Sequence, residues 1–257
     1  MQITVLASGS TGNCSLITEG STRILVDAGI SCKRIRTGLS ELGVRPEEIQ
    51  GVLITHEHVD HVAGLRVLEK NHNIPLYSTL PVIHALEQSG LSLGSTFHEI
   101  APGESFSLGG VSILPFHVPH DAADCSGYRI TGDSAVLGYA TDIGCITEEV
   151  VQGLSGSDLA LIEANHDVRM LQQGPYPYYL KQRILSSKGH LSNDSCAQLA
   201  EILKERGTRR FVLGHLSQKN NEPMIARKTV QNSLSLEPDR LFVAPALGNL
   251  TVRAKVV

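Results

Sequence analysis

One short segment concentrates chemically reactive side chains: residues 55–61 read Thr-His-Glu-His-Val-Asp-His. Three imidazoles and the Asp60 carboxylate fall within six consecutive positions, so they offer several nitrogen and oxygen donors to one small volume. Such a donor set suits Zn²⁺, Mn²⁺ or Fe better than Ca²⁺ or Mg²⁺, which prefer shells made only of oxygen. A solvated loop or a helix cap by Asp60 is the plain alternative, but a cap needs one carboxylate and no histidines. The segment therefore predicts a metal site.

The flanking residues show which elements would position this segment. Residues 51–54 form a short apolar run with β-branched side chains, which is typical of a buried strand. The apolar residues of 62–68 then keep helical spacing. We therefore expect the polar residues at the rim of a sheet, where a strand ends and a helix begins. Alternation along an extended segment directs His56 and His58 to one side, and the polar residues beyond the bend can face a second ion.

The spacing His56-x-His58-x-Asp60-His61 after an apolar strand resembles the signature of the metallo-β-lactamase superfamily. The later motifs of that family are also matched, by His120 followed by Gly127-Tyr128, by Thr141-Asp142-Ile143-Gly144 and by Gly214-His215-Leu216-Ser217. The resemblance covers essentially the whole chain. It implies a four-layer αββα sandwich, in which helices flank two mixed β-sheets, whereas the alternation of strands and helices alone predicts only an α/β protein. No composition break divides the chain, so we expect residues 1–257 to form a single domain.

The resemblance implies two divalent cations per chain, either zinc or manganese, with iron as a further option. The candidate ligands divide into His56, His58 and His120 for one ion, Asp60, His61 and His215 for the other, and Asp142 shared between both. His117 is the alternative to His120 in the same segment, and the spacing of the family motif favours His120. The chemistry of the family implies attack by a hydroxide held between the ions, with Asp60 and His190 as catalytic residues.

Two further segments are expected to support the histidines from outside. Asp27 ends an apolar run, where it could cap the next helix, but the resemblance implies that it fixes an imidazole of the cluster from behind. Residues 165–167 read Asn-His-Asp at the end of another expected strand, where they could line the cleft. We expect His166 to be an outer contact of this kind rather than a metal ligand.

Three residues are candidate substrate contacts. Ser10 and Asn13 belong to a turn rich in glycine and hydroxyl groups, which by itself predicts only a hairpin, although such turns can present N–H groups to an anion. In the resembling family this turn flanks the site, which favours a contact with substrate. His190 stands just before an expected helix, where free N–H groups favour an anion. The phosphodiesterase branches of the family carry a similar residue that contacts the scissile phosphate.

Composition excludes little. The chain has 257 residues, a net charge of −4, and 4% aromatic residues without tryptophan. The slight acidity gives no support to a general nucleic-acid coat, so binding to DNA would depend on a local basic patch. Five widely spaced cysteines predict neither a disulfide framework nor a structural zinc site. We expect no signal peptide and no membrane insertion, and hence a cytoplasmic protein.

Finer details resemble the compact bacterial YycJ/WalJ-type branch of the superfamily, which is related to the PhnP-type phosphodiesterases. Asn165-His166-Asp167 and the tyrosine-rich residues 174–179 fit the YycJ/WalJ type best. That resemblance implies a metal-dependent phosphodiesterase that acts on DNA as a 5′-to-3′ exonuclease. The alternatives are a hydrolase of cyclic phosphodiesters, esters or thioesters, and a non-catalytic metal-binding regulatory protein.

Overall fold

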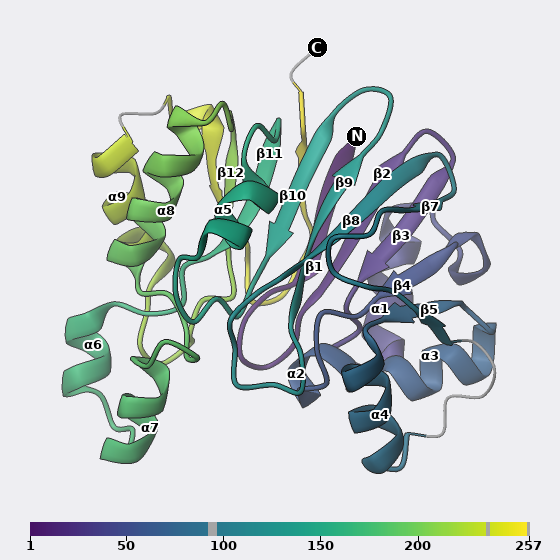
Figure 1. Ribbon diagram of the computed structural model, residues 1–257, viewed down its shortest axis with the longest axis horizontal. Coiled ribbons are helices and arrows are strands. Elements are labelled where there is room, and N and C mark those ends of the chain that lie inside the picture. Colours follow the sequence, from purple (N-terminus) through teal and green to yellow (C-terminus); the bar gives the residue numbers. More distant parts are fainter. Residues whose placement is uncertain (92–96, 235–236, 256–257) are drawn as a thin grey trace.

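Two β-sheets packed face to face, with helices on both outer surfaces, make up the protein (Figure 1). The computed structural model describes residues 1–91, 97–234 and 237–255. The arrangement is the four-layer αββα sandwich expected from the sequence, so that prediction is confirmed.

The first sheet has seven strands in the order β14-β1-β2-β3-β4-β5-β6. These strands are β1 (Gln2–Ala7), β2 (Cys14–Glu19), β3 (Thr22–Val26), β4 (Gly51–Leu53), β5 (Leu76–Ser78), β6 (Phe97–Glu99) and β14 (Leu250–Arg253). Pairing is antiparallel from β14 to β3 and parallel from β3 to β6. Because β3 and β4 run in the same direction, the loops that follow them leave the sheet at the same edge.

The second sheet also has seven strands, in the order β13-β12-β11-β10-β9-β8-β7. These strands are β7 (Phe106–Leu108), β8 (Val111–His117), β9 (Ser126–Thr131), β10 (Val136–Ala140), β11 (Leu159–Glu163), β12 (Phe211–Gly214) and β13 (Leu241–Val243). Pairing is antiparallel from β7 to β10 and parallel from β10 to β13. The loops after β10, β11 and β12 therefore also emerge together.

Helices cover the outer face of each sheet. On the first sheet these are α1 (Cys32–Glu41), α2 (Val59–Val62), α3 (Leu65–His72) and α4 (Leu80–Gln88). On the second sheet they are α5 (Glu148–Leu154), α8 (Asn193–Glu205) and α9 (Pro223–Leu234), with α6 (Val168–Gln173) and α7 (Tyr178–Ile184) extending below them in Figure 1. Short 3₁₀ helices span Pro46–Glu48 and Pro238–Arg240. Among the described residues, no helix combines the length and the apolar character needed to cross a membrane.

Strand alternation explains how each sheet is buried on both faces. In β3, Ile24 and Val26 point into the core between the sheets, whereas Leu25 packs under the helices. In β4, Leu53 faces the other sheet and Val52 faces the helices. Such strands read as continuous apolar runs in the sequence, as expected for strands covered on both sides.

The strand expected over residues 51–54 is present as β4, but the sequence patterns miss several other elements. The segments that they leave unassigned include β9, β14 and α6. β14 pairs antiparallel with β1, for example through Val252 and Ile3, and so joins the two ends of the chain in one sheet. Local periodicity cannot indicate a pairing between residues so far apart in sequence.

A buried tyrosine connects the sheets next to the histidine-rich segment, and we predict that its hydroxyl stabilises the fold. Tyr128 is fully buried, and its hydroxyl donates to the carbonyl oxygen of Ile54 at 2.6 Å. Tyr128→Phe should lower the free energy of unfolding by about 1 kcal/mol, since one buried hydrogen bond is lost. Denaturant unfolding measures this, with Tyr178→Phe as control because Tyr178 is 76% exposed. Equal stabilities of the two variants would contradict the prediction.

Candidate metal centre

Loops that follow strands of both sheets meet at one edge of the sandwich. Residues 55–61 follow β4 in the first sheet, whereas Asp142 and His215 follow β10 and β12 in the second. His120 lies in the loop between β8 and β9. The carboxyl ends of parallel strands are the usual place for ligand sites in α/β sheets.

Three imidazoles, those of His56, His58 and His120, form what we call the first group. His56 Nε2 lies 3.0 Å from His58 Nδ1. The ring centroid of His120 lies 5.1 Å from that of His56 and 5.2 Å from that of His58. One nitrogen from each ring falls within 4.8 Å of the others, a spacing that fits a single ion. His117 points elsewhere, because it is about half exposed and its Nδ1 lies 3.1 Å from Asp124 Oδ1.

Asp60, His61 and His215 form the second group. Asp60 Oδ2 lies 3.6 Å from His61 Nε2 and 3.5 Å from His215 Nε2. The ring centroids of the two histidines are 5.7 Å apart. One donor atom from each residue again falls within 4.8 Å of the others.

The buried carboxylate of Asp142 lies between the two groups. Its Oδ2 is 3.2 Å from Nε2 of His61, in the second group. Its Oδ1 is 3.7 Å from Nε2 of His120, in the first group, and 3.5 Å from Nδ1 of His215. One carboxylate thus reaches imidazoles of both groups, a position in which each oxygen could serve a different cation.

Several donor atoms at the centre are buried without a regular hydrogen bond. Within the described part of the chain, these include Asp142 Oδ2 and His215 Nε2. A buried polar atom without a partner costs about 1–3 kcal/mol, a cost that disappears when the atom binds a ligand. Imidazole nitrogens and carboxylate oxygens are also the donors that zinc and similar divalent ions take. The residues present therefore fit divalent cations.

Asp27 lies behind His61, where its expected supporting role would place it. Its Oδ2 is 2.8 Å from His61 Nδ1, and its Oδ1 accepts from the backbone N–H of Thr55 at 2.9 Å. The Thr55 hydroxyl lies 3.0 Å from both Asp27 Oδ2 and His56 Nδ1. Because this carboxylate engages Nδ1 of His61, Nε2 is the nitrogen that faces the other two members of the second group, Asp60 and His215.

Glu163 has the same position behind His215 in the second sheet, and it is absent from the residues predicted from the sequence. Its Oε1 lies 2.7 Å from His215 Nδ1 and 2.9 Å from His190 Nδ1. Its Oε2 accepts from the backbone N–H groups of Ile143 and Leu191. The signal for it was a single charged residue at the end of an otherwise apolar strand.

Backbone geometry turns three of these side chains inward. Asp27, Asp142 and His215 follow strand ends and have φ angles of 60°, 57° and 55°. The left-handed conformation is uncommon outside glycine and costs on the order of 1–3 kcal/mol per residue. The centre therefore concentrates backbone strain that the surrounding sheets must offset.

The turn at residues 8–13 lies against the second group. Asn13 is buried, and its Nδ2 lies 3.0 Å from His61 Nε2 and 3.2 Å from Gly9 O. The hydroxyl of Ser8 accepts from the backbone N–H of His215 at 2.7 Å. Ser10 is exposed in the same turn. Contact of Asn13 and Ser10 with substrate stays a prediction, and the contacts of Asn13 indicate that it also holds this turn in place.

His166 differs from the expectation of an outer contact. It is buried, yet neither ring nitrogen has a hydrogen-bond partner among the described residues. The reason is its position in the chain. β11 ends at Glu163, and the side chain of Glu163 already faces the centre. Three residues later, His166 lies beside Ser192, to which it is joined by a backbone bridge.

Burial and neighbouring charges shift the pKa values at the centre in different directions. Burial alone would lower the pKa of His215, but Asp142 and two further carboxylates outweigh it and raise that pKa to about 10. For His61, burial is likewise outweighed by Asp142 and Asp27, so its pKa lies well above the usual value. Burial instead dominates at His56 and lowers its pKa well below the usual value.

We predict that cation binding to stripped protein releases protons and weakens as the pH falls. The raised pKa values of His61 and His215 favour their protonated forms in the absence of cations, and only a neutral imidazole binds a metal ion. Zn²⁺ titration at neutral pH in weak buffer should release protons that an indicator dye records, and the Kd should rise as the pH is lowered. Binding without proton release, at a Kd independent of pH, would contradict the prediction.

Comparisons with known proteins cover nearly the whole chain. A family model described as a β-lactamase superfamily domain matches residues 22–216. The exodeoxyribonuclease WalJ of Streptococcus pneumoniae (serotype 2, strain D39) is 38% identical over 234 residues, which is 90% of this chain and 87% of that protein. The exodeoxyribonuclease YycJ of Bacillus anthracis is 33% identical over 236 residues, covering 91% and 89%.

A solved structure agrees in fold. Zn²⁺-bound PqqB from Methylobacterium extorquens has a TM-score of 0.76 at 20% identity, over 98% of this chain and 100% of that chain. The residues matched by the family model include both groups and Asp142. The chain therefore belongs to the metallo-β-lactamase superfamily, in the branch that contains WalJ and YycJ.

Proposed function

We propose that this protein is a metal-dependent phosphodiesterase that removes nucleotides from DNA in the 5′-to-3′ direction. The observation that carries the proposal is the joining of two donor groups by one buried carboxylate, Asp142. The similarity to two proteins named exodeoxyribonucleases supports DNA as the substrate.

In this proposal the first group holds one cation, the second group holds another, and Asp142 binds both. Zinc or manganese suits these donors, with iron as a further option. Two divalent cations bound there would lower the pKa of water, neutralise charge on a phosphodiester and align it for in-line displacement. Asp60 is the ligand carboxylate open to substrate, since its side chain is 20% exposed against 2% for Asp142. We assign Asp60 the role of orienting the attacking water.

His190 is placed to act on the leaving group. Its ring centroid lies 5.1 Å from that of His120 and 5.3 Å from that of His215, so it borders both groups. Glu163 engages its Nδ1, which leaves Nε2 for substrate. Burial alone would lower the pKa of His190, but Glu163 outweighs it and raises that pKa. The imidazole is therefore biased toward its protonated form, which can contact a phosphate and donate a proton to the leaving oxygen.

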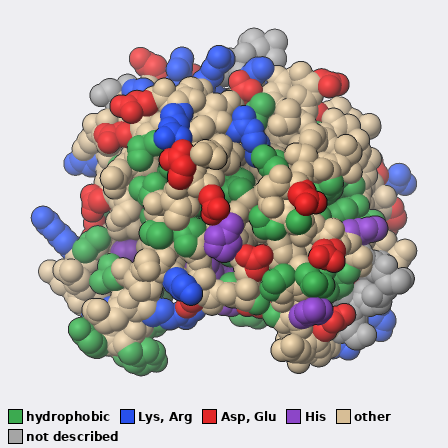
Figure 2. All heavy atoms as spheres, viewed as in Figure 1, with side chains coloured by type: hydrophobic (Ala, Val, Ile, Leu, Met, Phe, Trp, Pro, Cys, Tyr) green, Lys and Arg blue, Asp and Glu red, His purple; other side chains and the backbone are tan. Residues whose placement is uncertain are grey.

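The outline of the molecule leaves room for the end of a DNA strand. Figure 2 shows a notch in the lower outline between two lobes, with imidazole side chains on the face above it. In Figure 1 the lobes end in α7 and α4, and α2 lies between them. α2 follows directly on His58, so in this view the histidine-rich segment lies between the two lobes.

We predict that His190→Ala lowers turnover by roughly 10²–10⁴-fold, the usual contribution of a general acid or base, while the metal content stays intact. Turnover on a DNA strand and elemental analysis of the same preparation measure the two quantities. His117→Ala is the matched control, because this half-exposed histidine lies outside both groups. An equal loss of metal and turnover would make His190 a ligand, and unchanged turnover would contradict its catalytic role.

The proposed function itself is tested with stripped protein and labelled DNA. We expect no digestion after chelation and recovery of activity with Zn²⁺ or Mn²⁺. A single strand labelled at its 5′ end should release labelled mononucleotide first, whereas a strand labelled at its 3′ end should shorten stepwise. Cleavage of a thioester or a small aryl phosphodiester without digestion of DNA would favour a small-molecule hydrolase. Bound metal with no cleavage of any substrate would indicate a non-catalytic protein.

A further inference from the structure

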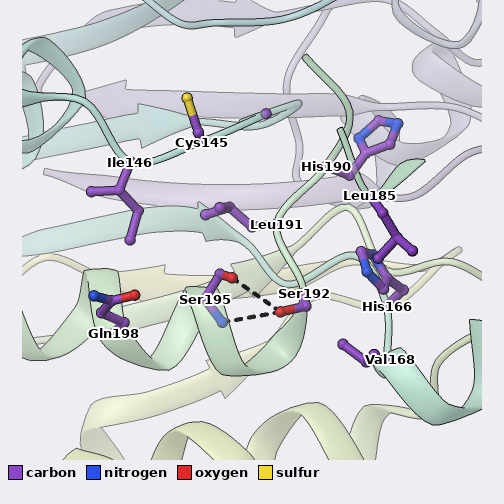
Figure 3. A pocket seen from close by; sticks show the side chains of 11 residues that line it. Cys145, Ile146, His166, Val168, Leu185, His190, Leu191, Ser192, Ser195 and Gln198 are labelled. Carbon is purple, nitrogen blue, oxygen red and sulfur yellow. Dashed lines mark hydrogen bonds between the residues drawn. The ribbon is translucent and has the colours of Figure 1, made fainter. Parts of the chain in front are cut away.

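A pocket of about 590 Å³ adjoins the metal centre at His190 (Figure 3). Its walls come from the loop after β10, the segment from His166 to the start of α6, the loop between α7 and α8, and the N-terminal end of α8. The lining residues that bear polar side chains include His166, His190, Ser192, Ser195 and Gln198. A pocket of this volume accommodates a ligand of the size of one nucleotide.

The buried histidine of this pocket lacks a partner. His166 is 1% exposed, and neither Nδ1 nor Nε2 makes a hydrogen bond within the described residues. Figure 3 shows its ring at the wall, between Leu185 and Ser192. Burial lowers its pKa to about 4, so the ring is neutral and has one N–H to donate. A buried donor left unpaired is costly, and a ligand bound in this pocket would remove that cost at His166.

The end of α8 supplies a second feature suited to an anion. α8 is 13 residues long, and its N-cap residue Ser192 accepts from the backbone N–H of Ser195. Both serines line the pocket beside this positive end of the helix dipole, and the Ser192 hydroxyl lies 3.1 Å from that of Ser195. Asp194, on the same turn, is exposed and is not among the residues that line the pocket. The lining holds no tyrosine, phenylalanine or tryptophan on which a base could stack.

We infer that this pocket binds the 5′-phosphate of the terminal nucleotide, an inference that depends on the proposed function. His166 and the N-terminal end of α8 contact that phosphate, and His190 stands between it and the scissile bond. The pocket adjoins the centre at the residue assigned to the leaving group, and in 5′-to-3′ digestion the leaving group is the terminal nucleotide. The enzyme therefore identifies a strand end by its phosphate.

The chemistry of one turnover regenerates the feature that the pocket recognises. The oxygen of water bonds to the phosphorus between the first and second nucleotides, and water loses a proton to solvent. The P–O3′ bond breaks, and O3′ takes a proton from His190, which solvent then replaces. The terminal nucleotide leaves with a 3′-hydroxyl, while the shortened strand keeps the attacked phosphate as its new 5′-phosphate. Only the first cleavage can therefore depend on how the original strand ended.

The kinetic test compares 5′-phosphorylated and 5′-hydroxyl strands of the same sequence, each labelled at its 3′ end, with metal-loaded enzyme. We expect the first nucleotide to be released roughly 10-fold or more slowly from the 5′-hydroxyl strand, because charge-assisted hydrogen bonds are lost. Later steps should proceed at one common rate. His166→Phe, which keeps the ring but removes its nitrogens, should bring the ratio of first-step rates toward one. Ser195→Ala should reduce the ratio, and His84→Phe, an exposed control on α4, should not.

A binding measurement provides a readout other than turnover. Fluorescence anisotropy with phosphorothioate strands, which resist cleavage, should show about 10-fold tighter binding of the 5′-phosphorylated strand. That preference should disappear in His166→Phe, with metal content equal to the wild type as the check on folding. Equal first-step rates on both strands, or a preference that survives in His166→Phe, would overturn this inference and leave the proposed function standing. Loaded enzyme that shortens neither strand would overturn the proposed function instead.

Discussion

The structure depends on compensating buried charge at short range, since an isolated charge away from water is very costly. Asp27, Asp142 and Glu163 are buried carboxylates, and each lies within 3.2 Å of an imidazole nitrogen. Asp27 follows a strand of the first sheet and Glu163 ends a strand of the second, and each engages one histidine of the second group from behind. Asp142 then faces both histidines. His61 and His215 are thus each fixed by carboxylates on two sides, so their free nitrogens converge on one small volume.

This convergence explains why the centre lies between the sheets and why the backbone accepts strain there. A side chain on one sheet can meet one on the other only where strands end at the same edge. The left-handed residues Asp27, Asp142 and His215 each make a sharp turn at such an end. The apolar core between the sheets, in which Tyr128 links the strands to the start of the histidine-rich segment, supplies the stability that offsets this strain. Rigid layers thereby hold loops that would otherwise be free to move.

The sequence predicted the parts of the site that local spacing encodes. The segment from His56 to His61 stands out by composition, and the resemblance carried by later motifs extended the expectation to His120, Asp142 and His215, which the structure places beside it. Glu163 was missed because one glutamate at a strand end has no spacing pattern, and its partners lie far away in sequence. His166 was expected to support a ligand because it follows the same strand, but three residues of loop carry it into a neighbouring pocket. β14 was not predicted for a similar reason, since its partner strand β1 is at the other end of the chain.

We propose that the two sheets together build a pair of cation sites joined by one carboxylate. An anomalous difference map from crystals of metal-loaded protein, collected at the absorption edge of the bound metal, tests it most directly. We expect two peaks, one among the imidazoles of His56, His58 and His120 and one among Asp60, His61 and His215, with Asp142 between them. A single peak held by Glu163 and His190, which also lie near Asp142 and His215, would contradict it.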